Sequence, residues 1–290
     1  MNINKFLLSA LVSVSLLSVS CVKNEEPVHA VEYELTFIAS DDDYEVFDYD
    51  DSGRISHWEY SDASHTMSYN ATYNYAEAPR TILINSEEIR SEDDTRRFEE
   101  TLHLDNDGTA VYAEGIAVLN MNGSDMKKKY RKDFQYDSFG HLILVKISEK
   151  RFNDTGWEEQ QPLEWYASLD WEADNLAKYT EYSNPSYPFL IKTYSYYEGI
   201  AVYYMPVIQG PAVNSFYLPL QYQGVLGRLS QSLVKECYYR DMAFRYSYNI
   251  STMASHSFIE SYVESTQGKE SAYTVGWQPK SCSSESLITE

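Results

Sequence analysis

The chain has 290 residues and is strongly acidic, with 23 Lys and Arg against 44 Asp and Glu and a formal net charge of −21. This charge excludes a general nucleic-acid-binding protein, because binding to phosphates needs a positive surface. Hydrophobic residues make up 43% of the chain, which excludes global disorder. The single long apolar run excludes a polytopic membrane protein. The 27 tyrosines favour a β-rich fold, since tyrosine suits pleated, half-buried surfaces.

The N-terminus has the pattern of a secretory signal. Lys5 precedes an apolar run over residues 6–19, which is short for a membrane span of about 20 residues. A serine and then Cys21 follow, which resembles a bacterial lipoprotein signal, where a small residue precedes a cysteine that becomes acylated. We therefore expect residues 1–20 to be a signal peptide, and residues 21–29 to be the acylated cysteine and a polar tether. The alternative is an ordinary cleaved signal that happens to precede a cysteine.

The tether also indicates where the protein resides. Glu25 and Glu26 resemble the acidic stretch of lipoproteins that Bacteroidetes export to the cell surface. We therefore expect an outer-membrane lipoprotein, on the cell surface or on the periplasmic face. Removal of residues 1–20 takes away only Lys5, which leaves 22 basic against 44 acidic residues and a net charge of −22. Such a surface repels anionic lipid, so the membrane is expected as a partner only through the lipid anchor.

Alternating patterns predict an antiparallel sheet in three parts of the chain. Apolar residues alternate with polar ones at residues 31–37, 163–171 and 242–250. A period of two with one apolar face is typical of a strand that packs on one side and meets water on the other. No equally long stretch has a convincing helical stripe. Residues 87–100 are polar and charged, and we expect a short helix or a loop there.

The middle of the chain interrupts this pattern. Five prolines lie within residues 184–219, so we expect this region to be partly loop, with a strand around Phe189–Tyr204 and a turn at Glu198-Gly199. No linker rich in glycine or serine divides the chain. This favours a single domain over residues 30–280, followed by a fraying tail at 281–290.

Four similar turns separate the expected strands. They lie at residues 47–55, 102–108, 134–142 and 169–176. An Asp at the strand end caps each turn, and a glycine accepts a positive φ as in a bulged hairpin. In the fourth turn Asn175 stands where the others have glycine. The spacing between the copies is irregular, so the sequence predicts a meander with loops of varied length and not a solenoid.

These turns resemble the YD-type repeat, aromatic-Asp-x-x-Gly-[Arg/His]-[Ile/Leu], at Tyr49–Ile55 and Tyr136–Leu142. With Cys21 and its signal, and with the segment Leu218–Ser230, they make the chain resemble a Bacteroidetes family of lipoproteins of unknown function, described as having a porin-like fold. The resemblance implies an all-β antiparallel meander that forms a long curved sheet or a barrel-like structure. It implies no activity and no catalytic residues. We expect no membrane pore, because a transmembrane barrel needs outward apolar faces of about 9–11 residues and charges interrupt these strands.

The sequence contains none of the common catalytic motifs. There is no HExxH pair, nucleophile elbow, P-loop or dinucleotide fingerprint. Acidic clusters at residues 41–43, 48–51 and 105–107 have the oxygen ligands that Ca²⁺ prefers, but turn chemistry explains the second and third. We therefore expect no metal, no cofactor and no enzyme activity. The runner-up is a secreted glycan-acting hydrolase, which would need two facing carboxylates.

Two cysteines remain after Cys21. Outside the cytoplasm, Cys237 and Cys282 can form a disulfide that ties the C-terminal tail to a strand, and two unpaired thiols are the alternative. Neither lies in a CxxC motif, so a metal site is not expected.

Aromatic residues are the candidates for ligand binding. A ring exposed on a rigid sheet can stack on the apolar face of a sugar. The candidates are Trp58, Tyr60, Trp157, Trp165 and Tyr166. The alternative is that these rings simply pack the sheet. We therefore expect a non-enzymatic binding protein, with a glycan, another ligand or a protein as partner, or a structural protein.

Overall fold

The computed structural model describes residues 33–64, 66–77, 80–153, 156–157, 162–184, 187–201, 208–253 and 256–279. The expected signal peptide (1–20), Cys21 and the tether (21–29), as well as Cys282 and the tail (281–290), lie outside these residues. The described strands belong to one compact unit, Glu32–Glu290.

The described residues form 17 strands, a 3-10 turn and a short helix. The strands are β1 (Tyr33–Ala39), β2 (Asp43–Tyr49), β3 (Ile55–Asp62), β4 (Ser68–Glu77), β5 (Arg80–Ser91), β6 (Asp94–Leu104), β7 (Ala110–Met121), β8 (Ser124–Tyr136), β9 (Leu142–Asn153), β10 (Gly156–Trp157), β11 (Leu163–Glu172), β12 (Asn175–Asn184), β13 (Tyr187–Ala201), β14 (Ser232–Tyr239), β15 (Met242–Met253), β16 (His256–Thr266) and β17 (Lys269–Pro279). Between β13 and β14 lie η1 (Ser215–Tyr217) and α1 (Leu218–Tyr222). Among the described residues, no helix has the length and apolar character needed to cross a membrane.

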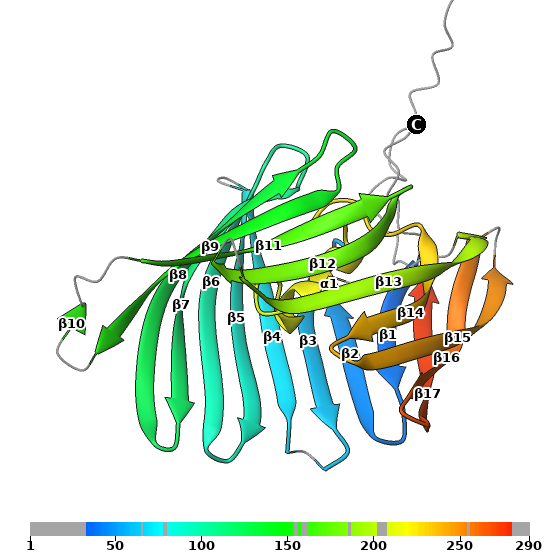
Figure 1. Ribbon diagram of the computed structural model, residues 1–290, viewed down its shortest axis with the longest axis horizontal. Coiled ribbons are helices and arrows are strands. Elements are labelled where there is room, and N and C mark those ends of the chain that lie inside the picture. Colours follow the sequence, from blue (N-terminus) through cyan, green and yellow to red (C-terminus); the bar gives the residue numbers. More distant parts are fainter. Residues whose placement is uncertain are drawn as a thin grey trace, which may run out of the picture. The chain divides into compact units, whose positions relative to one another are not determined.

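The strands close into a barrel (Figure 1). Each strand pairs antiparallel with the next in sequence, except that β11 pairs with β9, because the two-residue β10 pairs only with the last residues of β9. The ring closes where β17 pairs with β1, with Tyr33 opposite Pro279 and Ala39 opposite Thr274. Sixteen strands complete this ring. The expected all-β antiparallel meander is confirmed, and it takes the barrel form.

Two local expectations are wrong. Residues 87–100 form neither a helix nor a loop, because β5 and β6 cover almost all of them and pair as a hairpin. The hydropathy pattern hides these strands, since the buried side chains include the charged residues Glu88 and Glu100. Glu198 and Gly199 do not form a turn either, because both lie within β13.

The two faces of the wall differ in chemistry. On β8 the inward Tyr130 and Phe134 are buried, whereas the outward Lys129, Arg131 and Gln135 are exposed. A similar alternation runs along β5, β6 and β9. Successive side chains of a strand point to opposite faces. The inner face of these strands is therefore mainly apolar, and their outer face carries charged residues.

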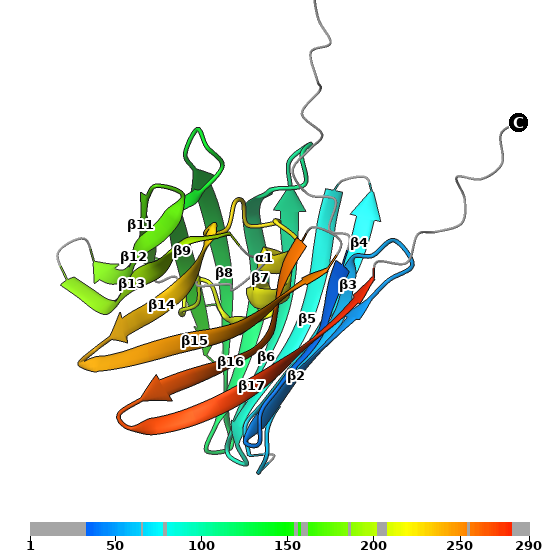
Figure 2. The same cartoon turned by 90° about the vertical axis from the view of Figure 1, so that its right-hand side faces the viewer.

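A segment between β13 and β14, residues 208–231, folds back into the barrel (Figures 1 and 2). We call it the plug. It contains η1 and α1, and its apolar side chains belong to the same buried cluster as the inner wall. Phe216 is almost fully buried, and Trp58 on β3 packs edge-on against it with ring centroids 6.2 Å apart. A ring of sixteen strands is too wide for wall side chains alone to fill, so the plug supplies the missing core.

Candidate functional site

Three of the repeated turns share one hydrogen-bonding pattern. The side chain of the capping Asp accepts hydrogen bonds from the backbone N–H groups two and four residues later, at 2.8–2.9 Å. The capping residues are Asp50, Asp105 and Asp137, and the glycines with positive φ are Gly53, Gly108 and Gly140. The expected cap and the expected glycine conformation are therefore confirmed in these three turns.

The fourth turn differs from its expected geometry. The positive φ angles fall on Ala173 and Asp174, and not on Asn175. Asn175 binds the first residue of β14 instead, because its side-chain oxygen accepts a hydrogen bond from the N–H of Ser232 at 2.9 Å. The next residue, Leu176, donates its N–H to the hydroxyl of Ser230 at 3.0 Å.

All four turns lie on the same rim of the barrel. Neighbouring strands run in opposite directions, and the strands that precede the four turns, β2, β6, β8 and β11, all run in the same direction. The amide of Gln223 in the plug bridges the first turn. Its nitrogen donates to the carbonyl oxygen of Gly53 at 3.0 Å, and its oxygen accepts from the N–H of Ile55 at 3.1 Å. The first turn thus binds the plug through its backbone groups.

The second and third turns bind the plug in the same way. The N–H of Ala110 donates to the carbonyl oxygen of Val225, and the N–H of Arg228 donates to that of Gly140, both at 2.8 Å. The YD-type turns therefore do more than reverse the chain. They present a series of backbone groups on one rim, and the segment that the sequence singled out at 218–230 is what they hold.

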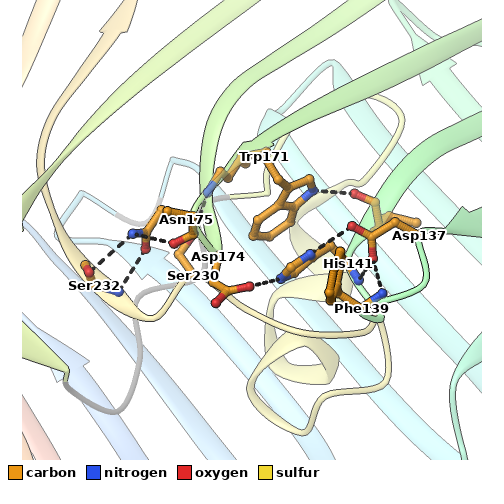
Figure 3. A network of polar contacts seen from close by, with 11 residues as sticks. Asp137, Phe139, His141, Trp171, Asp174, Asn175, Ser230 and Ser232 are labelled. Carbon is orange, nitrogen blue, oxygen red and sulfur yellow. Dashed lines mark hydrogen bonds and ion pairs between the residues drawn. The ribbon is translucent and has the colours of Figure 1, made fainter.

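His141 links the third and fourth turns (Figure 3). It is 3% exposed, with Nδ1 3.0 Å from Asp137 Oδ2 and Nε2 3.3 Å from Asp174 Oδ1. Its ring stacks on Trp171 at a centroid distance of 4.5 Å, and the indole N–H of Trp171 donates to the carbonyl oxygen of Leu142 at 2.8 Å. These contacts make His141 a structural residue of the hairpins.

A buried polar cluster joins the plug to the wall. Lys132 on β8 and Glu100 on β6, each 4% exposed, form an ion pair with Nζ 3.2 Å from Oε2. The hydroxyl of Tyr217 in the plug donates to Glu100 and accepts from Lys132 Nζ at 3.3 Å. Burial lowers the pKa of Lys132, although the charge of Glu100 opposes the shift. The plug is thus attached by charge as well as by packing.

Towards the opposite rim, tyrosines line the inner wall. Rings follow one another across β15, β16 and β17, with Tyr248 6.1 Å from Tyr262 and Tyr262 4.5 Å from Tyr273. Another pair faces the interior on β3 and β4, with its ring centroids 5.4 Å apart. All are partly exposed. We call this set the tyrosine wall: Tyr60, Tyr69, Tyr246, Tyr248, Tyr262 and Tyr273.

Carboxylates lie among these rings. Glu45 on β2 accepts a hydrogen bond from the indole N–H of Trp58 at 3.2 Å. Burial raises its pKa from 4.5 to about 7, and the charge of Asp43 adds to the shift, while the bond from Trp58 opposes it. Burial also raises the pKa of Glu264 on β16, and raises that of Tyr273 to about 12 with help from Asp43 and Glu264. The tyrosine wall and these acids form one polar region inside the barrel.

Glu45 makes the stability of the protein depend on pH. Its pKa of about 7 in the fold exceeds the ordinary 4.5, so the folded protein holds this proton more tightly than the unfolded chain does. The contribution of Glu45 to stability is fully present below about pH 4.5 and is lost as the pH rises to about 7. Glu45→Gln cannot ionise, and it should reduce the fall in melting temperature between about pH 5 and pH 8. An equal fall in both proteins would contradict this assignment.

The five aromatic residues expected from the sequence do not share one site. Trp58 is 2% exposed, which leaves its ring no surface for a ligand, whereas Tyr60 belongs to the tyrosine wall. Trp165 packs against the core from β11, and its neighbour Tyr166 faces outward and stacks on Tyr182 at 4.6 Å. Trp157 lies on β10, and its side chain is outside what the structure describes.

Sequence reasoning missed most of the tyrosine wall. Tyr246 and Tyr248 alternate with Ser247 in an expected strand, so their shared face could be read from the spacing. The spacing could not show that this face lies beside Tyr262 and Glu264, because that contact depends on the pairing of β15 with β16.

A polar cleft of about 390 Å³ opens beside β1 and β2. Its lining includes Glu34, Asp48, Asp50 and Asp51. Asp50 already caps its turn, and Asp48 Oδ2 lies 3.1 Å from the ring of His57. Asp48 and Asp50 are therefore engaged in the structure of the hairpin, and the tyrosine wall remains the candidate site.

In the described part of the chain, no group of three or more His, Cys, Asp or Glu side chains could hold a metal ion. This holds for the acidic clusters and for the surroundings of Cys237 alike. Cys237 on β14 is a buried thiol, and burial raises its pKa to about 11. Because Cys282 lies outside the described residues, the disulfide and the pair of unpaired thiols both stay predictions.

Comparisons with known proteins find similarity among solved structures. No protein-family model matches the chain, and no curated protein matches it. Among solved structures, a porin-like protein from Bacteroides uniformis ATCC 8492 is similar to this chain, with a TM-score of 0.49 and 13% sequence identity. The match covers 85% of this chain and 96% of that protein.

Proposed function

We propose that this protein is a non-enzymatic, lipid-anchored protein of the outer membrane, on the cell surface or the periplasmic face, that binds a glycan inside its barrel. The tyrosine wall carries the proposal, because its rings are partly exposed and lie beside Glu45 and Glu264. Phenol rings stack on the apolar faces of sugars, and carboxylates accept hydrogen bonds from sugar hydroxyls. A structural role without a ligand is the alternative within the same class.

The arrangement of the wall supports a barrel surrounded by water. Transmembrane barrels have an apolar outer band and a polar interior. In this protein the buried cluster of apolar side chains is inside, and charged residues such as Lys129 and Lys146 are exposed outside. The plug also occupies the interior. We therefore propose that the acyl chains on Cys21, and not the wall, make the membrane contact.

Replacing Cys21 tests the anchor. Cys21→Ala should release the protein from the membrane fraction into the soluble fraction, because the acceptor of the lipid is lost. Cys237→Ser removes a cysteine elsewhere in the chain and should leave the protein in the membrane fraction. Retention of Cys21→Ala in membranes would contradict the lipid anchor.

Two matched tyrosine variants test the binding site. Tyr262 stacks on Tyr273 inside the barrel at 4.5 Å, and Tyr166 stacks on Tyr182 outside it at 4.6 Å. A neutral oligosaccharide that raises the melting temperature of the wild type should bind Tyr262→Ala about tenfold more weakly, because a stacking ring is lost. Tyr166→Ala should bind it as the wild type does.

The outcome of this titration separates the alternatives. Equal weakening by the two variants would contradict a site at the tyrosine wall. A panel of neutral oligosaccharides without any effect on the wild type would favour the structural role.

A glycan-acting hydrolase is the second candidate function, and Glu45 is the observation that favours it. A carboxyl group with a pKa of about 7 can serve as a general acid near neutral pH, and Glu264 is a second carboxyl group in the same region. Chromatography of oligosaccharides incubated with the protein distinguishes the two functions. Shorter products that Glu45→Gln no longer forms would replace the binding proposal by the hydrolase.

A further inference from the structure

The outer face of β8 and β9 is basic, although the chain as a whole has a net charge of −21. Side chains at every second position of β8 point outward, and those of β9 continue the same face through its pairing with β8. Four lysines on this face are exposed, and we call them the lysine stripe: Lys127, Lys129, Lys146 and Lys150.

Within the stripe, two like charges lie directly opposite each other. Lys129 pairs across the strands with Lys150, and like charges in this position destabilise a sheet. The inner face of the same strands shows the balanced arrangement. There Lys128 lies opposite Arg151, and Glu149 forms ion pairs with both. Its Oε2 is 3.0 Å from Lys128 Nζ, and its Oε1 is 3.7 Å from Arg151 Nη2. In the described part of the chain no carboxylate forms an ion pair with any lysine of the stripe.

The surroundings of the stripe favour a narrow anionic chain over a flat anionic surface. Acidic residues flank it on the outer face, including Glu114 on β7 and Glu164 on β11. Asp133 on β8 lies opposite Lys146 and forms an ion pair with Arg131. A membrane would have to meet these carboxylates together with the lysines, whereas a linear chain can follow the strand between them. Lys127 and Lys129, together with Arg131, extend over about 13 Å of one strand.

Aromatic rings border the stripe as well. Lys146 lies opposite Tyr166, which stacks on Tyr182. On the other side, the guanidinium of Arg131 lies 4.1 Å from the ring centroid of Tyr112. Rings beside cations suit a ligand that has both apolar faces and negative groups, and sugars with carboxylate or sulfate groups have both.

We propose that the lysine stripe binds an anionic polysaccharide through its carboxylate or sulfate groups. This site lies on the outer face of the wall and is separate from the proposed site for a neutral glycan inside the barrel. The free energy that the like charges cost the protein alone is recovered when anionic groups of the ligand lie between them.

Titration of the full-length protein with polygalacturonate and dextran sulfate, at low and at physiological salt, tests the proposal. The wild type should bind both polymers and not neutral dextran, and the affinity should fall as salt rises because these charges are exposed. Lys129→Gln/Lys150→Gln should bind about fivefold more weakly. Lys235→Gln/Lys269→Gln removes the same charge from other exposed positions and should change the affinity by less than about twofold.

The melting temperature of the double variant separates lost binding from lost folding. Because Lys129→Gln/Lys150→Gln removes a repulsion, the unliganded variant should be at least as stable as the wild type. Equal weakening by the two double variants, or no binding of either polymer by the wild type, would overturn the proposal. Binding to vesicles that contain phosphatidylglycerol, without binding to the polymers, would replace the polysaccharide by a membrane surface.

Discussion

Lys132→Met is expected to lower the free energy of unfolding by about 3–5 kcal/mol, because it leaves the buried carboxylate of Glu100 without its cation. Both residues are 4% exposed, and Nζ lies 3.2 Å from Oε2. Methionine has a similar volume, so the loss reports on charge more than on packing. Urea unfolding followed by tryptophan fluorescence measures the change.

Two further variants make this result specific. Lys127→Met changes an exposed lysine on the same strand and should alter the free energy of unfolding by less than about 0.5 kcal/mol. Glu100→Gln combined with Lys132→Met removes both charges and should recover part of the loss. A double variant less stable than Lys132→Met alone would show that the ion pair is not the source of the effect.

Gly227→Ala is expected to lower the free energy of unfolding by about 2–5 kcal/mol, from backbone strain and overpacking together. Gly227 has φ +84°, and an added Cβ would overlap the carbonyl oxygen of Gly140 and lie 2.8 Å from a ring carbon of Tyr136. That carbonyl accepts the hydrogen bond from Arg228. The substitution therefore pushes the plug away from the third turn.

Gly268 provides the matched control for this prediction. It has φ +78° in the β16–β17 turn on the opposite rim, and an added Cβ would meet nothing within 4 Å. Gly268→Ala should therefore show the cost of the φ angle alone, about 1–2 kcal/mol. If urea unfolding gave similar losses of free energy of unfolding for the two variants, the contact between the plug and the third turn would contribute little to stability.

Local patterns accounted for the strands whose inward side is apolar. The alternation at 163–171 and 242–250 matches β11 and β15, whose strands extend only a little beyond it. The pattern failed at 87–100, where Glu88 and Glu100 face the interior. Their charges are balanced by cations that include Arg96 and Lys132, and these partners come from β6 and β8. The window over residues 87–100 contains Glu88 together with Arg96, but it does not contain Lys132, the partner of Glu100.

The candidate site shows the same division. The sequence indicated that aromatic residues on a sheet could bind a ligand, and one of its candidates, Tyr60, is a partly exposed residue of the inner wall. It could not distinguish Trp58, which the plug covers through Phe216, from Tyr60 two residues later on the same face. Burial of Trp58 depends on a segment more than 150 positions away in the chain, so no local rule could reveal it.

The sequence by itself determined the antiparallel meander and the capped turns, because alternation and Asp-x-x-Gly capping act between residues a few positions apart. Only the tertiary structure decided that the meander closes, that the plug fills it, and that the turns hold the plug. Those features rest on contacts between distant residues, such as Ile55 with Gln223 over 168 positions and Glu100 with Tyr217 over 117. Packing and hydrogen bonding select such contacts only when the whole chain has folded.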